Sequence, residues 1–234
     1  MLISFDKKFL FIHIPKNAGT SITNVLTPFA FDPGSKKVNN ILNFPFDYTQ
    51  RKLKFHIKKR ILLIKSPVGI KLGISNSGSL KHAKAVDLKK ILGKNLFDNL
   101  FKFAFVRNPW AKEVSNYEYI KRRKDHPLNP LIHFHSLSLE QFLEWKISKN
   151  YKSPQLNFIA DYNDNLLVDF IGKVEDIDRD IKKISKQINI DSEKVPKLNS
   201  RKQPYNYQEF YNSHSKKLVE ILHEKELKLF DYSF

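Results

Sequence analysis

Hydrophobic residues in this chain form short continuous runs that alternate with longer stretches of helical spacing. The runs Phe9–Ile14 and Leu100–Val106 are rich in Phe, Leu and Ile, as buried strands are. Arg60–Lys65 and Leu166–Val174 are similar runs and predict two further strands. Apolar residues three and four apart predict helices over Ile22–Leu26, Leu80–Leu92, Trp110–Lys124, Ser138–Lys149, Ser153–Ala160, Glu175–Ile190 and Tyr207–Leu229.

The alternation of strands and helices predicts an α/β fold. We expect a mostly parallel central sheet flanked by helices, in a three-layer, P-loop-like arrangement. Helix-end signals agree with this order. Thr20 or Ser21 is expected to cap the first helix, Gly93 to end another, and Ser138 to cap a third with Gln141 three residues on.

The 234 residues fit one domain over 1–234. Residues 29–80 differ from the rest because Pro and Gly interrupt them repeatedly. Loops of this length in a compact domain are often functional. We therefore interpret 29–80 as a loop-rich excursion that forms part of a substrate (acceptor) binding site.

The chain carries a formal net charge of +17, from 41 basic and 24 acidic residues. A field of this sign attracts polyanions such as nucleic acid, an anionic membrane, or a multiply charged small molecule. The sequence contains no cysteine, so disulfide and thiol chemistry are excluded. It has no apolar stretch near the roughly 18 to 20 residues that span a bilayer, and no signal-peptide pattern at its start.

The most informative stretch is Phe9–Ser21, FLFIHIPKNAGTS. Pro15 ends the predicted strand because proline has no backbone N–H, and small residues with one lysine, Lys16, lead into a helix. A strand, a tight loop and a helix N-terminus together form an anion-binding site, since backbone N–H groups and the helix dipole converge there. The loop lacks the Gly-Lys-Ser/Thr ending of a Walker A loop.

The segment HIPKNAGTS resembles HIPKTAGTS, the signature of the family-2 (carbohydrate-type) sulfotransferases, with Asn17 in place of the usual Thr. The resemblance implies a protein that uses PAPS (3′-phosphoadenosine 5′-phosphosulfate). Many animal members of that family carry a membrane anchor, and because the sequence shows no apolar stretch of that length we expect a soluble member. We expect a bacterial, cytoplasmic protein. The resemblance also implies that the loop holds the 5′-phosphosulfate end of PAPS through Pro15, Lys16, Asn17, Ala18, Gly19, Thr20 and Ser21.

A second motif, Phe103–Tyr117 (FAFVRNPWAKEVSNY), resembles the 3′-phosphate motif of the same family, FVRNPWDRLVSxY. The resemblance implies that Arg107 and Ser115 hold the 3′-phosphate of PAPS, and a guanidinium fork fits a phosphate well. Ala111 and Lys112 replace a common Asp-Arg pair, which puts any bidentate contact there in doubt.

Arg201 and Lys202, in a late basic stretch, are expected to close over the cofactor; a solvated basic loop is the alternative interpretation. His13 is expected to order the first loop from the end of its strand. His133 and His135 alternate and would share one face on an extended segment, a spacing that could suit a metal. No third ligand accompanies them, so no metal is expected.

The predicted reaction moves the sulfuryl group of PAPS to a hydroxyl of a carbohydrate or similar acceptor by in-line displacement. Lys16 is assigned to the charge that develops on the leaving phosphate, by analogy with phosphoryl transfer. His82 lies between the two motifs and is the preferred general base, since histidine titrates near neutral pH. The positive charge of the chain also suits an acidic acceptor.

Two other functions stay open at this point. A nucleotide kinase or NTPase shares the strand, loop and helix, but the chain shows neither a Gly-Lys-Ser/Thr loop nor a clear Mg²⁺-binding carboxylate. A basic nucleic-acid-binding domain would explain the charge, but no known binding module is present and the charge is dispersed, so no nucleic-acid partner is expected.

Overall fold

The computed structural model describes residues 1–30, 80–151, 154–191 and 206–234. These residues belong to two compact units, which comprise residues 1–106 with 157–198 and residues 107–156 with 199–234. The strand expected at Arg60–Lys65, nearly all of the 29–80 excursion, and Arg201 and Lys202 lie outside the described residues. The single-domain interpretation stays a prediction.

The first unit contains a four-stranded sheet with the order β1-β2-β3-β4. Its strands are β1 (Leu2–Ser4), β2 (Phe9–Ile12), β3 (Phe101–Val106) and β4 (Phe170–Lys173). The β2–β3 and β3–β4 pairs are parallel, and β1 pairs antiparallel with β2. The prediction of a mostly parallel sheet is confirmed, whereas β1 was not expected because three residues are too few to show a pattern.

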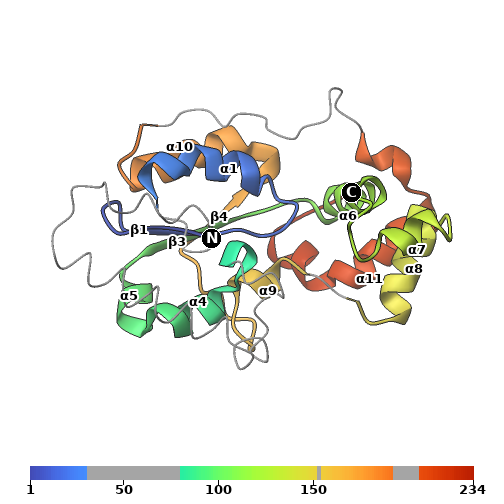
Figure 1. Ribbon diagram of the computed structural model, residues 1–234, viewed down its shortest axis with the longest axis horizontal. Coiled ribbons are helices and arrows are strands. Elements are labelled where there is room, and N and C mark those ends of the chain that lie inside the picture. Colours follow the sequence, from blue (N-terminus) through green and yellow to red (C-terminus); the bar gives the residue numbers. More distant parts are fainter. Residues whose placement is uncertain (31–79, 152–153, 192–205) are drawn as a thin grey trace. The chain divides into compact units, whose positions relative to one another are not determined.

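Helices cover both faces of this sheet (Figure 1). On one face, α1 (Gly19–Leu26) and α10 (Ile177–Gln187) bury the aromatic side chains of β2 and β3. Phe11 and Phe103 are paired by the strand register, and their ring centroids lie 5.5 Å apart. Full burial of one such side chain contributes about 1.5–3 kcal/mol, so this aromatic layer stabilises the strand register that positions the loop after β2.

The opposite face is covered by α4 (Ala85–Leu92) and α5 (Lys94–Asp98) (Figure 1). Lys102 alternates with the aromatic residues of β3, and its Nζ lies 5.3 Å from the ring of Phe97 in α5. Helix, sheet and helix thus form the layers expected from the sequence, while the resemblance to a P-loop fold stays a prediction.

Several predicted elements are shorter in the structure than in the sequence pattern. The helix expected over Leu80–Leu92 is a 3-10 turn, η3 (Leu80–His82), followed by α4, with extended backbone at Lys84. Gly93 ends α4 as expected. The strand expected over Leu166–Val174 is reduced to β4, with an isolated bridge between Ala160 and Leu166 before it. The 3-10 turns η1 (Thr27–Phe29) and η4 (Val174–Asp176) follow α1 and precede α10.

The second unit is helical. Its elements are α6 (Pro109–Arg122), α7 (Asn129–His133), α8 (Leu139–Ser148), η5 (Tyr207–Phe210) and α11 (Ser213–Leu229). Their shared core contains Trp110, Val114, Ile120, Phe142, Leu143, Val219 and Leu222. The short helix α9 (Leu156–Ile159) begins at Leu156 in the second unit, and its other residues belong to the first unit.

Helix ends in the second unit test three further predictions. Ser138 and Gln141 form the expected capping box at α8. The closing helix expected over Tyr207–Leu229 is interrupted, because Asn212 caps α11 and leaves η5 as a separate turn. The condition for His133 and His135 to share a face is not met, since His133 is the last residue of α7 and the segment is not extended there.

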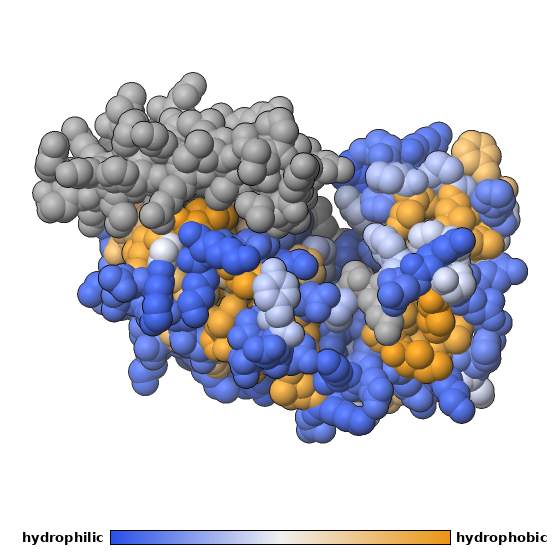
Figure 2. All heavy atoms as spheres, turned by 90° about the horizontal axis from the view of Figure 1, so that it is seen from below, coloured by the Kyte–Doolittle hydropathy of each residue, from blue (hydrophilic) through white to orange (hydrophobic). Residues whose placement is uncertain are grey.

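Within the ranges described above, no helix is long and apolar enough to cross a membrane. On the face shown in Figure 2, hydrophilic residues cover most of the described surface and hydrophobic residues form separate patches.

Candidate functional site

The loop after β2 has an unusual backbone. Lys16 and Ala18 both have positive φ angles, 68° and 53°, in the left-handed region that L-residues rarely adopt. Each such residue costs about 1–2 kcal/mol relative to a right-handed conformation. Alternating left-handed residues turn successive backbone N–H groups toward a common side, which is how backbone nests for anions are built.

The helix that follows this loop begins without a side-chain cap. Ala18 is the N-cap residue of α1, and its methyl group accepts no hydrogen bond. The expected cap by Thr20 or Ser21 is wrong, because α1 already begins at Gly19 and places both residues inside its first turn. The first N–H groups of a helix have no partner within it, and the positive end of the helix dipole lies there, so a helix start of this kind favours an anion.

Gly19 is required by the ring of His13. A Cβ atom added at Gly19 would lie 1.7 Å from His13 Nε2, which no real structure tolerates. His13 is itself buried and stacks on Phe11 with ring centroids 5.8 Å apart. Burial first, and the neighbouring His82 second, lower the pKa of His13 to about 2, so the ring is neutral at pH 7. The His13 ring therefore packs directly on the backbone of Gly19, which fits the expectation that His13 orders the loop.

Asn17 connects the same loop to the end of β3. Its Nδ2 donates a hydrogen bond of 2.8 Å to the carbonyl oxygen of Phe105, and the side chain is buried. An amide at this position can reach the strand and donate, which gives the departure from the family signature a structural role.

His82 lies in η3 and is held by the main chain of His13. Its Nδ1 is 2.9 Å from the His13 carbonyl oxygen, and the two ring centroids are 4.5 Å apart. A carbonyl oxygen only accepts, so Nδ1 carries the proton and Nε2 keeps its lone pair. Partial burial lowers the pKa of His82, the His13 carbonyl opposes that shift, and Lys81 adds to it. His82 therefore has the tautomer and the charge state of a general base.

The turn after β3 begins with Arg107, and its main chain is paired by one side chain. The N–H of Arg107 donates to Gln155 Oε1 at 2.8 Å, and Gln155 Nε2 donates back to the Arg107 carbonyl at 2.9 Å. Gln155 has no exposed surface. The carboxamide takes the place of a neighbouring strand for one residue, which fixes the backbone at Arg107.

The helix after this turn is capped tightly. Asn108 Oδ1 accepts from the N–H groups of Trp110 at 3.1 Å and Ala111 at 3.4 Å, and Pro109 occupies the first helical position. Asn108 Nδ2 donates to the carbonyl of Ser233 at 2.9 Å. The phenyl ring of Phe234 contacts those of Trp110, Tyr207 and Tyr211, with centroids 5.5–5.9 Å apart.

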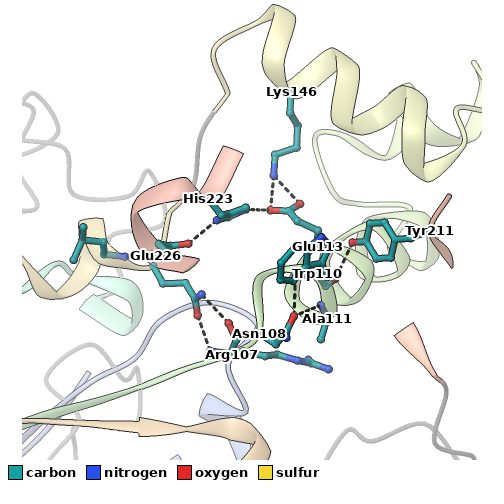
Figure 3. A network of polar contacts seen from close by, with 11 residues as sticks. Arg107, Asn108, Trp110, Ala111, Glu113, Lys146, Tyr211, His223 and Glu226 are labelled. Atoms are coloured by element: carbon teal, nitrogen blue, oxygen red, sulfur yellow. Dashed lines mark hydrogen bonds and ion pairs between the residues drawn. The ribbon is translucent and has the colours of Figure 1, made fainter. Parts of the chain in front are cut away.

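A buried ionic network joins α6 to α8 and α11 (Figure 3). Lys146 Nζ donates to both carboxylate oxygens of Glu113 at 2.7 Å, and His223 Nε2 lies 2.9 Å from Glu113 Oε1. His223 Nδ1 lies 2.5 Å from Glu226, whose other oxygen accepts from the Leu156 N–H at 2.8 Å. The exposed fraction of each of these four charged or polar side chains is 2 % or less.

Charge pairing in this network outweighs burial. Burial raises the pKa of Glu113, but Lys146, His223 and Lys112 hold it well below its ordinary value. The pKa of Glu226 is also lowered, against the effect of burial, chiefly by His223. The sequence analysis did not single out these residues, although a signal was present: Glu113 lies three residues after Trp110 and Lys146 three residues after Leu143, so each places a charge on the apolar side of its helix.

The structure also places the remaining residues of the second motif. Ser115 is half-buried in α6, two residues after Glu113. Lys112 is buried, and burial lowers its pKa while Glu113 and Glu226 oppose the shift. Its ammonium group therefore faces the ionic network.

Metal-ligating atoms come together at one place among the described residues. Oxygens of Glu140 and Glu144 and a ring nitrogen of His214 lie within 4.8 Å of one another. His214 pairs with Glu144 at 3.1 Å, and Asn212 Nδ2 donates to Glu140 at 2.6 Å. These bonds account for the cluster as a polar contact between α8 and α11.

The predicted site residues therefore fall into two groups. The loop 15–21 and His82 belong to the first unit and are linked through His13, whose ring packs on Gly19 and whose carbonyl holds His82. Arg107 and Ser115 belong to the second unit, at the start of α6 and within it. Gln155 was not predicted, and its place beside Pro154 gave no signal beyond a short helix.

Two comparisons bear on this geometry. Residues 1–233 match the sequence profile of the Sulfotransferase family. A protein of Archaeoglobus fulgidus, described only as uncharacterized, is 37% identical over 118 residues, which cover 48% of this chain and 88% of that protein.

Proposed function

Because the chain belongs to the Sulfotransferase family, we propose that it transfers the sulfuryl group of PAPS to a hydroxyl of a carbohydrate or similar acceptor. The observation that carries the proposal is the loop after β2. Lys16 and Ala18 in this loop are left-handed, and α1 begins directly after them without a side-chain cap. A phosphosulfate group is the type of ligand that such a loop takes.

In this proposal the residues from Pro15 to Ser21 hold the 5′-phosphosulfate end of PAPS. Lys16 balances the negative charge that grows on the phosphate as it leaves. Gly19 lets the loop close over the buried His13 ring, so the N–H groups are fixed before the ligand binds. Fixed donors stabilise a developing charge without reorganisation during the reaction.

Arg107 and Ser115 are assigned to the 3′-phosphate. Here the backbone supplies less, since the Asn108 side chain already accepts from the first N–H groups of α6. The side chains must therefore make the contacts, and a guanidinium offers two parallel donors to a phosphate. Arg201 and Lys202 keep their proposed role in closing over the nucleotide.

His82 is proposed as the general base. As the acceptor oxygen forms its bond to sulfur, His82 Nε2 takes the hydroxyl proton, and the bond between sulfur and the bridging phosphate oxygen breaks with its electron pair on PAP. The hydrogen bond from Nδ1 to the His13 carbonyl supports this role because it fixes the required tautomer.

Thermal unfolding with separate ligands tests the proposal. PAP is expected to raise the midpoint of unfolding, since a ligand at 100 times its Kd stabilises the state that binds it by about 2.7 kcal/mol. ATP and duplex DNA are the comparison ligands. A shift with ATP but none with PAP would favour a kinase or NTPase, and a shift with DNA alone would favour nucleic-acid binding.

Acceptor choice is tested by incubating the protein with PAPS and a panel of neutral and acidic sugars. We expect sulfated product with a subset of hydroxyl-bearing sugars, and none when His82 is replaced by Ala. Product formation that is unaffected by His82→Ala would place the base elsewhere.

A further inference from the structure

Gln155 carries a role that the sequence did not suggest. Its side chain is fully buried, and both ends of its carboxamide are used on one residue, the main chain of Arg107. The oxygen and the nitrogen of this buried carboxamide thus both fix the backbone of Arg107. The Arg107 N–H and carbonyl therefore have defined partners directly after β3 ends.

Gln155 is itself held in place by the ionic network. The N–H of the next residue, Leu156, donates to Glu226 at 2.8 Å, and Glu226 connects through His223 to Glu113 in α6. Glu113 lies two residues before Ser115 in the same helix. The two side chains assigned to the 3′-phosphate are thus linked to a single set of buried polar contacts.

Stability alone does not explain this arrangement. A buried ion pair contributes little over well-packed apolar residues, because taking charges out of water is costly. A carboxamide that pairs with a single main-chain residue is more specific than an apolar side chain of the same size, since its donor and acceptor fix both distance and direction.

We propose that Gln155 is a positioning residue for the 3′-phosphate of PAPS. It holds the Arg107 backbone so that the guanidinium is presented in one orientation, and Glu226 and His223 hold Gln155. The inference rests on the proposed function, specifically on Arg107 as a 3′-phosphate ligand.

The test compares two nucleotides that differ by one group. PAP carries a 3′-phosphate and 5′-AMP does not, so the ratio of their Kd values reports the 3′-phosphate contribution at fixed pH and salt. Gln155→Met keeps the size of the side chain and removes both hydrogen bonds. We expect it to weaken PAP binding about tenfold or more and to leave 5′-AMP binding unchanged, as for a charge-assisted hydrogen bond that is lost.

Gln155→Glu provides a second readout that a purely structural role would not move. At neutral pH it presents a carboxylate oxygen to the Arg107 carbonyl, and the preference for PAP should fall. As pH is lowered, the carboxyl group gains a proton and with it an O–H donor. The preference should then recover relative to the wild-type protein measured at the same pH. If Gln155→Met does not fold, the pH dependence of Gln155→Glu still tests whether Gln155 positions Arg107.

Asn129→Met is the matched control. Asn129 is also a buried amide, and its Nδ2 donates to the carbonyls of Ile120 and Lys121 at the far end of α6, at 2.8 and 3.2 Å. Asn129→Met should lower the unfolding midpoint without changing the ratio of the Kd values for PAP and 5′-AMP.

A double variant tests whether the two residues act together. Arg107→Ala combined with Gln155→Met should lose little more PAP affinity than Arg107→Ala alone.

Two results would overturn the inference, and they are distinguishable. If wild-type protein prefers PAP, Arg107→Ala removes the preference, and both Gln155 variants keep it while losing stability, then Gln155 is structural only. If wild-type protein binds PAP and 5′-AMP equally, the proposed 3′-phosphate site fails, and the positioning role fails with it.

Discussion

Two turns in this protein look alike in sequence and differ in how they meet a phosphate. Both follow a parallel strand, contain a proline and lead into a helix: Pro15–Ser21 after β2, and Arg107–Pro109 after β3. The helix after the first turn has no side-chain cap, whereas Asn108 accepts from two N–H groups of the helix after the second.

The capped and uncapped helix starts suggest that the two turns bind a phosphate in different ways. The first turn leads into a helix without a side-chain cap and contains a single charged residue, Lys16, so we propose that its backbone does most of the binding. At the second turn, Asn108 already accepts hydrogen bonds from the first N–H groups of the helix. We therefore propose that phosphate recognition there comes from side chains, chiefly Arg107. The two turns also differ in backbone strain. Lys16 and Ala18 in the first turn are left-handed, whereas no residue of the second turn, 107–109, has a positive φ angle.

The largest expected effect is at His82. We expect His82→Ala to lower kcat by about 10²–10⁴ and to leave PAP affinity unchanged, because the ring removes a proton and binds no phosphate. In wild-type protein, turnover should fall with decreasing pH only below the ordinary value for histidine, since burial lowers the pKa of His82 and the base works in its neutral form. Initial rates across pH, with Kd for PAP at each pH, measure both effects.

A rate that declines at or above pH 6.5 on the acid side would conflict with the assignment of His82. The variant His82→Gln is a useful companion, because its amide can still donate to the His13 carbonyl but cannot take a proton. It should fold as the wild type does and remain inactive.

Lys16→Ala should have the next largest effect. We expect kcat to fall by about 10²–10³, because a fixed charge at the leaving group is lost, while PAP affinity falls much less, since the loop N–H groups remain. Steady-state kinetics and titration with PAP provide the two values. Equal losses in kcat and in affinity would make Lys16 a plain binding residue and would weaken the contrast between the turns.

Gly19→Ala should act on the first turn through packing. The added methyl group would lie 1.7 Å from His13 Nε2, so the ring and the loop must move apart, at a cost of about 1–3 kcal/mol. Thermal unfolding should show the loss, and PAP binding should weaken with it. Adding His13→Ala removes the clash and should restore part of the stability; no recovery in the double variant would show that the ring is not the cause.

Asn108→Ala should have the smallest effect and addresses the second turn. Loss of this cap should lower stability by about 0.5–2 kcal/mol. It also frees the N–H groups of Trp110 and Ala111, so PAP affinity would rise if backbone donors at α6 could bind the phosphate. We expect no rise. Asn108→Asp keeps the acceptor, loses the donor to Ser233, and is the matched control for stability.

Sequence reasoning located both turns and most of the layers around them. The apolar runs at β2 and β3 and the capping box at Ser138 depend on local patterns, and these predictions are confirmed. The prediction of a cap at Thr20 or Ser21 was wrong because the backbone is left-handed at Ala18 and the helix begins directly after it. Alanine rarely adopts this conformation, so the sequence did not indicate it.

Features that depend on distant contacts were not predictable from the pattern. Gln155 and Arg107 are 48 residues apart, and Glu113 and His223 are 110 apart, so no periodicity connects them. Asn17 and Phe105 are 88 residues apart, so the hydrogen bond between them could not be predicted from a local pattern either. The roles of the loop residues, His82, Arg107 and Ser115 stay predictions.

The most direct test of the contrast is one titration series with PAP and 5′-AMP against wild-type protein, Lys16→Ala and Arg107→Ala. The account predicts that Arg107→Ala erases the preference for PAP and leaves 5′-AMP binding intact, while Lys16→Ala weakens both nucleotides modestly and keeps the preference. A series in which Arg107→Ala retains the full preference for PAP would contradict it.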